Sequence, residues 1–210
     1  MKSRGVKIAI AVAVGVIVAA LAAYALVMVS SVNRAMNSYG QARESFQLAK
    51  ESVEKWDFAS AYASTRKALD SLSELSDNLA EPQWDIAAFL PILGSDVRTA
   101  RELAAINGKL VDEAVLPILD QLESQANAGL LVDAIGALTG SDRGTQALSG
   151  RIEELKNKVD QSTSVVYECE DRLSTLPDSH FDQLDEAVNT CREAVTTAAA
   201  LLRTCEKIIT

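Results

Sequence analysis

The stretch WDIAAFLPILGSDVRTARELA, Trp84 to Ala104, marks the point at which the chain changes direction. Its first half is apolar but contains Pro91 and Gly94, so one uninterrupted helix is not expected there. Its second half begins with Ser95 and Asp96, and either side chain can accept a free backbone N–H as the N-cap of a helix. The stretch therefore predicts an apolar connector followed by a new helix.

The composition on both sides of this connector favours helices. Hydrophobic residues make up 48% of the 210 residues and aromatic residues only 5%. Helical spacing runs from Val32 to Trp56, and a second helical segment covers Ala59 to Leu79, so these two are expected to form an antiparallel hairpin. The residues expected to face the core in the first of them are Val32, Met36, Tyr39, Ala42, Phe46, Ala49, Val53 and Trp56.

The first thirty residues contain the strongest signal in the chain. No charged residue occurs from Ile8 to Val29, and as a helix this segment would rise about 33 Å, enough to cross a bilayer core. Lys2, Arg4 and Lys7 precede it, which places the N-terminus in the cytoplasm and the rest of the chain outside. The segment therefore predicts a single-pass protein of the cell membrane.

A cleaved signal peptide is the alternative interpretation of the same segment. Ala20-Leu21-Ala22 has the form of a cleavage site, but the apolar residues continue to Val29, further than a signal peptide requires. Small residues also recur every fourth position at Ala11, Gly15, Ala19 and Ala23, a spacing that lets two transmembrane helices approach closely. The simpler explanation of this spacing is that Ala and Gly are common in such anchors.

The remainder of the chain divides into a central segment, a connector and a hairpin. We expect a cytoplasmic tail over 1–7, the anchor over 8–30, and over 31–126 a helical hairpin, the apolar connector and a third helix that Pro117 kinks or splits. A Gly-rich connector with one short helix is expected over 127–150. Over 151–210 apolar residues step three and four apart, which predicts a coiled-coil-like helical hairpin, with Ser179 and Asp182 in the form of a capping box. The expected fold class is thus all-α, with one transmembrane helix followed by an extracytoplasmic antiparallel bundle.

Three cysteines fall on the seam of the C-terminal hairpin. Cys169 and Cys191 come to adjacent levels if the hairpin turns near residue 178, so a disulfide is possible in an oxidising environment. Buried free thiols are the simpler interpretation, since cysteine often behaves as a small hydrophobic residue. Cys205 lies two heptads beyond Cys191, too far for a bridge within one helix.

The residue types argue against several classes of function. Removing the three basic residues before the anchor from the 20 in the chain leaves 17 against 29 acidic residues, a net charge of −12 that repels nucleic acid. His180 is the only histidine and no CxxC pair occurs, so a metal site is not expected. No phosphate-binding glycine motif and no nucleophile elbow are present. We therefore expect a protein without a cofactor that is not an enzyme.

The connector also carries a resemblance to a known family. The matching residues have the pattern W…LPxLGxDVRxAR, and the upstream stretch DFASAYASTRKAL (Asp57–Leu69) resembles the same family's second helix. The chain thereby resembles the N-terminal region of the actinobacterial membrane-anchored family of the domain of unknown function four-thousand-twelve. That resemblance implies an anchored helical architecture and no known activity. Members usually continue into a sizeable C-terminal domain, so we expect the chain to be either a fragment or a minimal member. The matching connector residues are Trp84, Leu90, Pro91, Leu93, Gly94, Asp96, Val97, Arg98, Ala100, Arg101 and Leu103.

The apolar side chains of the connector admit two interpretations. The first helix is expected to run away from the membrane and the second to run back over a similar length. The connector is therefore expected within about 10 Å of the bilayer. Its residues could rest in the membrane interface or close the end of the bundle, and the two are compatible. The residues concerned are Trp84, Phe89, Leu90, Ile92 and Leu93.

These features together predict a non-catalytic helical spacer or scaffold of the cell envelope. Its five helices would run alternately away from and toward the membrane, beginning and ending with a helix that runs away from it. This path leaves the C-terminus far from the membrane, where it could present a further domain or contact a partner. The expected partners are the lipid bilayer and a protein, or a second copy bound through helices, and no nucleic acid. The alternative is a subunit of a membrane complex or a ligand-sensing ectodomain that acts through a partner protein. An envelope enzyme is a third, less favoured class, because no catalytic group of residues can be assembled.

Overall fold

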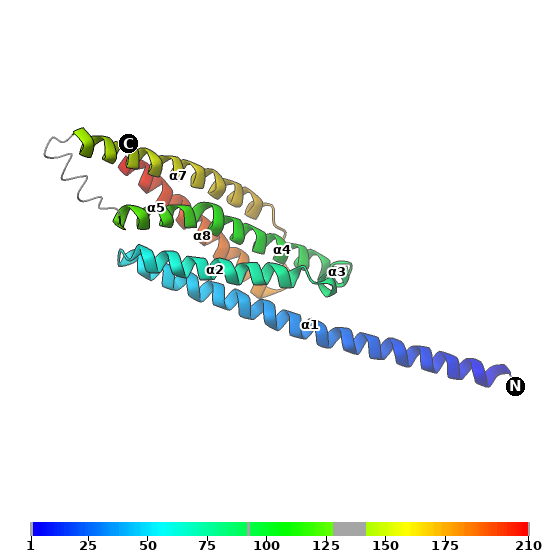
Figure 1. Ribbon diagram of the computed structural model, residues 1–210. Helices are drawn as coiled ribbons and strands as arrows, with labels where there is room; N and C mark the ends of the chain where they lie inside the picture. The colour runs from blue at the N-terminus through cyan, green and yellow to red at the C-terminus, as the bar shows by residue number, and fades with distance from the viewer. Residues whose placement is uncertain (1, 92, 128–141, 210) are drawn as a thin grey trace.

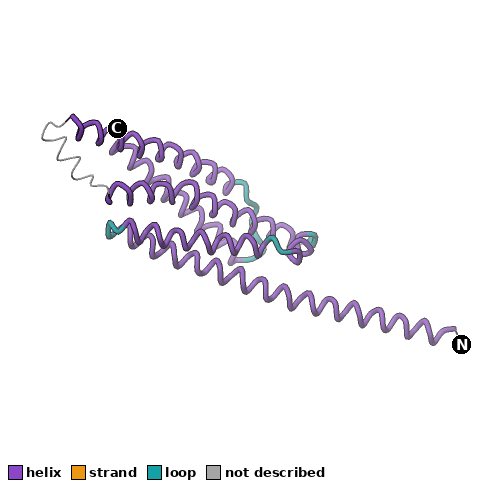
Figure 2. The backbone as a smooth tube through the Cα atoms, viewed as in Figure 1, coloured by secondary structure: helices purple, strands orange, loops and turns teal. Residues whose placement is uncertain are grey.

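The computed structural model describes residues 2–91, 93–127 and 142–209, and it describes side chains from residue 22 onward except at 92, 125–148, 197, 200, 201 and 204–210. Every regular element within these ranges is helical and none is a strand, so the all-α prediction is confirmed (Figure 2). The elements are α1 (Lys2–Glu54), α2 (Phe58–Leu79), α3 (Pro82–Ala88), α4 (Leu93–Lys109), the π-helical turn η1 (Leu110–Val115), α5 (Leu116–Asn127), α7 (Asp142–Ser174) and α8 (Asp182–Ile209).

The long helices run alternately in opposite directions, as the sequence predicted. The α1–α2 hairpin packs through α2 on the α4–η1–α5 segment, whose other side carries α7 and α8. Figure 1 shows the first half of α1 projecting alone from the bundle, with the C-terminus at the opposite end. Among the residues whose side chains the structure describes, no helix meets the length and apolarity that a membrane crossing requires.

Small side chains form the contact between α1 and α2. On α1 the buried positions are occupied by Ser and Ala, four or seven residues apart, along the helix that packs against α2. Small residues at such a seam let two helix axes approach closely, as in packed membrane helices. The buried residues are Ser31, Ser38, Ala42 and Ala49 on α1, and Ala61, Thr65, Ala68 and Leu72 on α2.

This seam corrects the predicted core stripe of α1. Ala42 and Ala49 are buried as expected, but Val32, Met36 and Val53 are exposed, and Trp56 lies beyond the helix with 80% of its surface exposed. The reason is that part of the buried row of α1 consists of serines, Ser31 and Ser38, and the larger apolar residues lie to the side of this row. Apolar periodicity found the two alanines and missed the serines, because serine carries no hydrophobic signal.

The turn between α1 and α2 has the hydrogen bonds of a Schellman motif. Trp56 occupies the left-handed position after the helix, with φ 61°, where glycine is usual. The Asp57 N–H donates to the Ser52 carbonyl oxygen (2.9 Å), and the Trp56 N–H donates to the Val53 carbonyl oxygen (3.0 Å). The Asp57 side chain then caps α2 by accepting from the Ser60 N–H (3.0 Å). Local bonds thus fix this reversal.

The third long segment changes helix type directly before its proline. Pro117 has no N–H and its ring clashes with the carbonyl group four residues earlier, so a regular α-helix cannot continue through it. The π-helical turn η1 precedes α5, and Pro117 is the second residue of α5. The predicted effect of Pro117 thus takes the form of a change of helix type, and the helical segment itself continues from α4 through η1 into α5 without being split. The start of this segment differs, because α4 begins at Leu93 and neither Ser95 nor Asp96 is its N-cap.

The C-terminal hairpin confirms the predicted seam. The largest core cluster contains residues of both helices together with Leu103, Ile106, Leu110 and Ala114. The Gly-rich connector is shorter than expected because α7 already begins at Asp142, and the short helix expected near 130–138 lies outside the described residues. The predicted hairpin residues in this cluster are Val159, Val166, Cys169 and Leu173 on α7, and Val188, Cys191, Val195 and Leu202 on α8.

Candidate functional site

The corner between α2 and α4 is built around Trp84. Its side chain is 9% exposed and packs with Leu79, Ala87, Val97 and Ala104, so it closes this end of the bundle. Pro82 starts α3 at a position where a proline costs no hydrogen bond. The sequence predicted an apolar connector here, and most of that connector is this short helix.

Gly94 makes the tight passage from α3 into α4 possible. A Cβ built at this residue would collide with the Ala88 carbonyl oxygen, so a larger residue does not fit without a shift of the backbone. The Gly94 N–H also donates to the Leu90 carbonyl oxygen (2.8 Å). The close approach explains why glycine stands at the centre of the connector motif.

The other apolar residues of the corner face solvent. Phe89 is 89% exposed, Ile86 56% and Leu90 44%, and their spacing of three and four puts them on one side of α3 and its end. We call Ile86, Phe89 and Leu90 the apolar tip. Leu93 is half-buried, and Ile92 lies outside the described residues. The two interpretations of the connector thus apply to different residues, since Trp84 closes the bundle and Phe89 and Leu90 do not.

Polar contacts attach α3 to α1 at a defined level. Tyr24 Oη donates to the Gln83 carbonyl oxygen (3.1 Å), and Gln83 Nε2 donates to Ser31 Oγ (2.7 Å). Arg34 Nη2 donates to Glu81 Oε2 (2.7 Å), and Glu81 also receives a hydrogen bond from Gln83. These contacts satisfy the fully buried Ser31 hydroxyl and fix α3 beside the part of α1 that contains Tyr24 and Ser31.

Arg101 links three elements at the same corner. Its Nε donates to the Leu79 carbonyl oxygen at the end of α2 (2.8 Å), and its Nη2 binds Asp85 of α3 (2.7 Å). The arginine therefore satisfies a carbonyl group that a helix end leaves without an internal partner. Each of the two carboxylates in the 81–91 segment, Glu81 and Asp85, has an arginine partner.

Asp96 has a role that the sequence pattern did not predict. Its buried carboxylate accepts from Ser179 Oγ (2.8 Å), from the His180 N–H (3.0 Å) and from the His180 ring at Nδ1 (3.1 Å). Burial by itself raises the pKa of Asp96, but these hydrogen bonds outweigh it, and the pKa lies below its usual value. The predicted capping box is wrong, because Ser179 binds Asp96 and its N–H donates to Asp185 (3.0 Å) instead of forming the pair with Asp182.

The two described cysteines are free thiols in the core. Cys169 Sγ donates to the Ile106 carbonyl oxygen (3.8 Å), and Cys191 Sγ donates to Asn107 Oδ1 (3.2 Å). Burial raises the pKa of Cys169 and raises that of Cys191 to about 12. The arrangement is that of the buried-thiol alternative, and the disulfide is not formed in this structure. The side chain of Cys205 lies outside the described residues.

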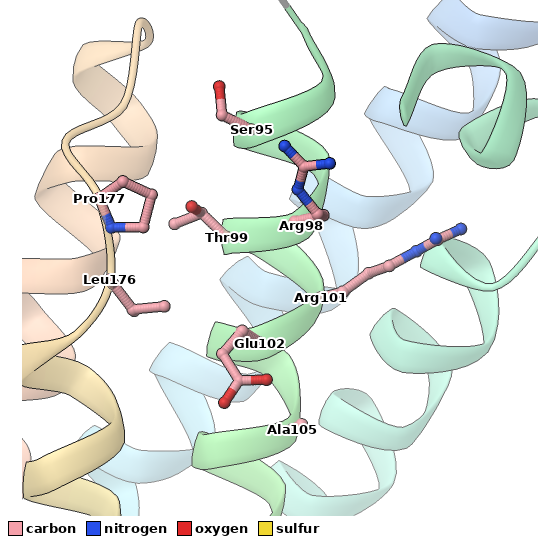
Figure 3. A pocket seen from close by; sticks show the side chains of 8 residues that line it. All are labelled: Ser95, Arg98, Thr99, Arg101, Glu102, Ala105, Leu176 and Pro177. Carbon is pink, nitrogen blue, oxygen red and sulfur yellow. The ribbon is translucent and has the colours of Figure 1, made fainter. Parts of the chain in front are cut away.

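A hollow of about 610 Å³ lies between α4 and the loop after α7 (Figure 3). Thr99 points toward Pro177, whereas Arg101 points to the opposite side of its helix. Glu102 is already paired with Arg172 (2.8 Å), so its charge is satisfied within the bundle. The hollow is open to solvent and lacks the converging polar groups of a small-molecule site.

The other predicted features add no chemistry. Within the described ranges no three His, Cys, Asp or Glu side chains lie close enough to hold a metal ion. Ala23 is exposed on α1, and the side chains of Ala11, Gly15 and Ala19 lie outside the described residues.

In comparisons with known proteins, no family model, no curated protein and no solved structure matches the chain.

The sequence missed several residues of the corner. Ile86 could have been found, because it lies three positions before Phe89 and belongs to the same helical face. Tyr24 stands inside the apolar segment, where a phenol is a signal for a polar contact. The partner of Asp96 could not be found, since nothing local in the sequence indicates a contact 83 residues away.

Proposed function

We propose that the chain is a non-catalytic helical spacer or scaffold of the cell envelope, anchored by the apolar segment Ile8–Val29. The observation that carries this proposal is the continuity of α1, which extends from Lys2 to Glu54 without a break. A continuous helix transmits the orientation of an anchor to the bundle, whereas a flexible linker would not. The basic residues Lys2, Arg4 and Lys7 favour a cytoplasmic N-terminus, so the bundle lies outside.

The dimensions of α1 support a spacer. Its 53 residues rise about 80 Å, of which an inserted segment would use about 30 Å. The remainder, paired with α2, holds the far end of the bundle away from the bilayer. The C-terminus lies at this far end (Figure 1), a position suited to presenting a further domain or contacting a partner.

Protease protection in cells tests the topology. Intact cells with the wall removed are treated with protease, and the chain is followed with one tag at the N-terminus and one at the C-terminus. The proposal predicts that the C-terminal tag and the bundle are cut while the N-terminal tag stays protected. Cutting of both tags only after the membrane is lysed would contradict it.

A further inference from the structure

The apolar tip lies on the exposed side of α3 and its end. Ile86, Phe89 and Leu90 are exposed, while Trp84 and Ala87 on the other side of α3 are buried. Exposed apolar residues that cluster on one face mark a surface that meets another apolar phase. The tip lies at one end of the bundle, the end from which the N-terminal half of α1 projects (Figure 1).

The charged side chains around the tip are paired with opposite charges, as a medium of low polarity requires. The segment from Glu81 to Pro91 contains two charged residues, and each is neutralised by an arginine at 2.7 Å. The Gln83 side chain turns inward, to Ser31 and Glu81. A charge near hydrocarbon is costly unless it is paired, so the neutral tip contrasts with a chain whose net charge is −9.

The contacts between α3 and α1 fix the position of the tip along the axis of α1. Tyr24 is bound to Gln83, and Met28 packs against the cluster around Trp84. From Ile8, a helix reaches Tyr24 after about 24 Å, whereas the hydrocarbon core of a bilayer is about 30 Å thick. About 20 residues are needed to cross it, which extends the inserted segment to about Val27. An inserted α1 therefore brings α3 down to the membrane boundary.

We infer that α3 is a second membrane contact, with the side chains of Ile86, Phe89 and Leu90 placed in the lipid interface beside the anchor. The inference rests on the proposed anchoring by Ile8–Val29. One helix crossing a bilayer leaves its extracellular part free to tilt and rotate about its axis. A second apolar contact beside it fixes both, so the bundle stands in one orientation. The occupant of the tip is thus the lipid, and neither a headgroup charge nor a protein partner is required.

Fluorescence quenching in vesicles tests the inference on the full chain. The parent is W56F, which keeps Trp84, and two variants each add one indole: F89W at the tip and L48W at an exposed position of α1 farther from the N-terminus. Each chain is reconstituted in phosphatidylcholine vesicles with bromine atoms high on the acyl chains. We expect the bromines to remove roughly half of the emission of the indole at position 89, and none at position 48.

The outcomes separate the inference from the proposed function. Equal emission with and without bromine at position 89, in a chain that floats with the vesicles at alkaline pH, would overturn the inference and leave the anchor in place. An indole at position 89 that is unquenched yet blue-shifted in both detergent and vesicles would show a second protein copy on the tip and overturn the inference as well. A chain that does not float with the vesicles would contradict the anchor itself.

Discussion

Asp96 is a buried carboxylate whose hydrogen bonds hold the loop between α7 and α8 against the first turn of α4. The two segments are 83 residues apart in the sequence, so this contact closes a long loop through one side chain. The Ser179 hydroxyl and both His180 donors converge on it, as the geometry of a carboxylate with two acceptor oxygens allows. Such charge-assisted hydrogen bonds are stronger than neutral ones.

The variant D96N is expected to lower the free energy of unfolding by about 1–3 kcal/mol at neutral pH, because it replaces the buried charged acceptor of three hydrogen bonds with a neutral amide. The folded pKa of Asp96 is depressed, so its stabilisation is complete above its unfolded pKa of about 3.9 and is lost as the pH falls through the folded pKa. Urea unfolding between neutral and acid pH should therefore show the two chains converging below about pH 4. A constant difference at all pH values would contradict this role.

Cys169 and Cys191 are expected to resist alkylation in the folded chain. Thiolate is the reactive form, and burial raises the pKa of both thiols, that of Cys191 to about 12. Iodoacetamide at mildly alkaline pH should leave both peptides unmodified until denaturant is added, as peptide mass spectrometry would show. Rapid labelling of the native chain, or a cross-linked peptide pair, would refute the arrangement.

At the scale of helices, the contact between α1 and α2 depends on side chains that carry little hydrophobic signal. The sequence predicted the hairpin and both of its helices, because helical spacing and the turn residues are local. It misplaced part of the core face of α1, since apolar periodicity selects Val32 and Met36, whereas the buried positions in this part of the helix are Ser31 and Ser38. Close packing of helix axes is a property of two elements, and a pattern within one does not show it.

The variant A68L should destabilise the chain, whereas A63L on the same helix should not. Ala68 is fully buried on the packed side of α2, and the larger leucine side chain there overpacks the core and costs about 1–3 kcal/mol. Ala63 is exposed, and a surface substitution usually changes stability by less than about 0.5 kcal/mol. Urea unfolding of the three chains measures both effects, and equal stabilities would mean that α2 is not closely packed at Ala68.

The variants G94A and G40A should have opposite signs. At Gly94 a Cβ collides with the Ala88 carbonyl oxygen, so G94A is expected to cost about 1–3 kcal/mol. At Gly40, inside α1, a Cβ meets nothing within 4 Å, and alanine should stabilise the helix by about 0.5–1 kcal/mol. Thermal unfolding followed by circular dichroism compares them. A stabilising G94A would disprove the tight corner.

At the scale of the whole molecule, the alternating path of the helices was predictable and the placement of the corner was not. Repeats of three and four residues predict the C-terminal hairpin, and Pro117 indicates the place where the helix type changes before α5. The apolar residues of the connector allowed two interpretations, closure of the bundle or contact with the membrane. Only the packing of the folded chain shows that Trp84 is buried and Phe89 is exposed. The sequence does not show which of these residues is buried, because burial depends on which side of α3 faces the end of α2 and α4.

The central claim is that the uncleaved segment Ile8–Val29 holds the bundle in the membrane, and the mass of the chain from washed membranes tests it most directly. Membranes are extracted at alkaline pH to remove peripheral proteins, and the remaining chain is weighed by intact-protein mass spectrometry. The account predicts that a chain expressed with the printed sequence stays in the membrane pellet with its apolar segment complete, at the 22.5 kDa of these 210 residues apart from loss of Met1. A chain released by the wash, or one that has lost the residues up to Ala22, would contradict it.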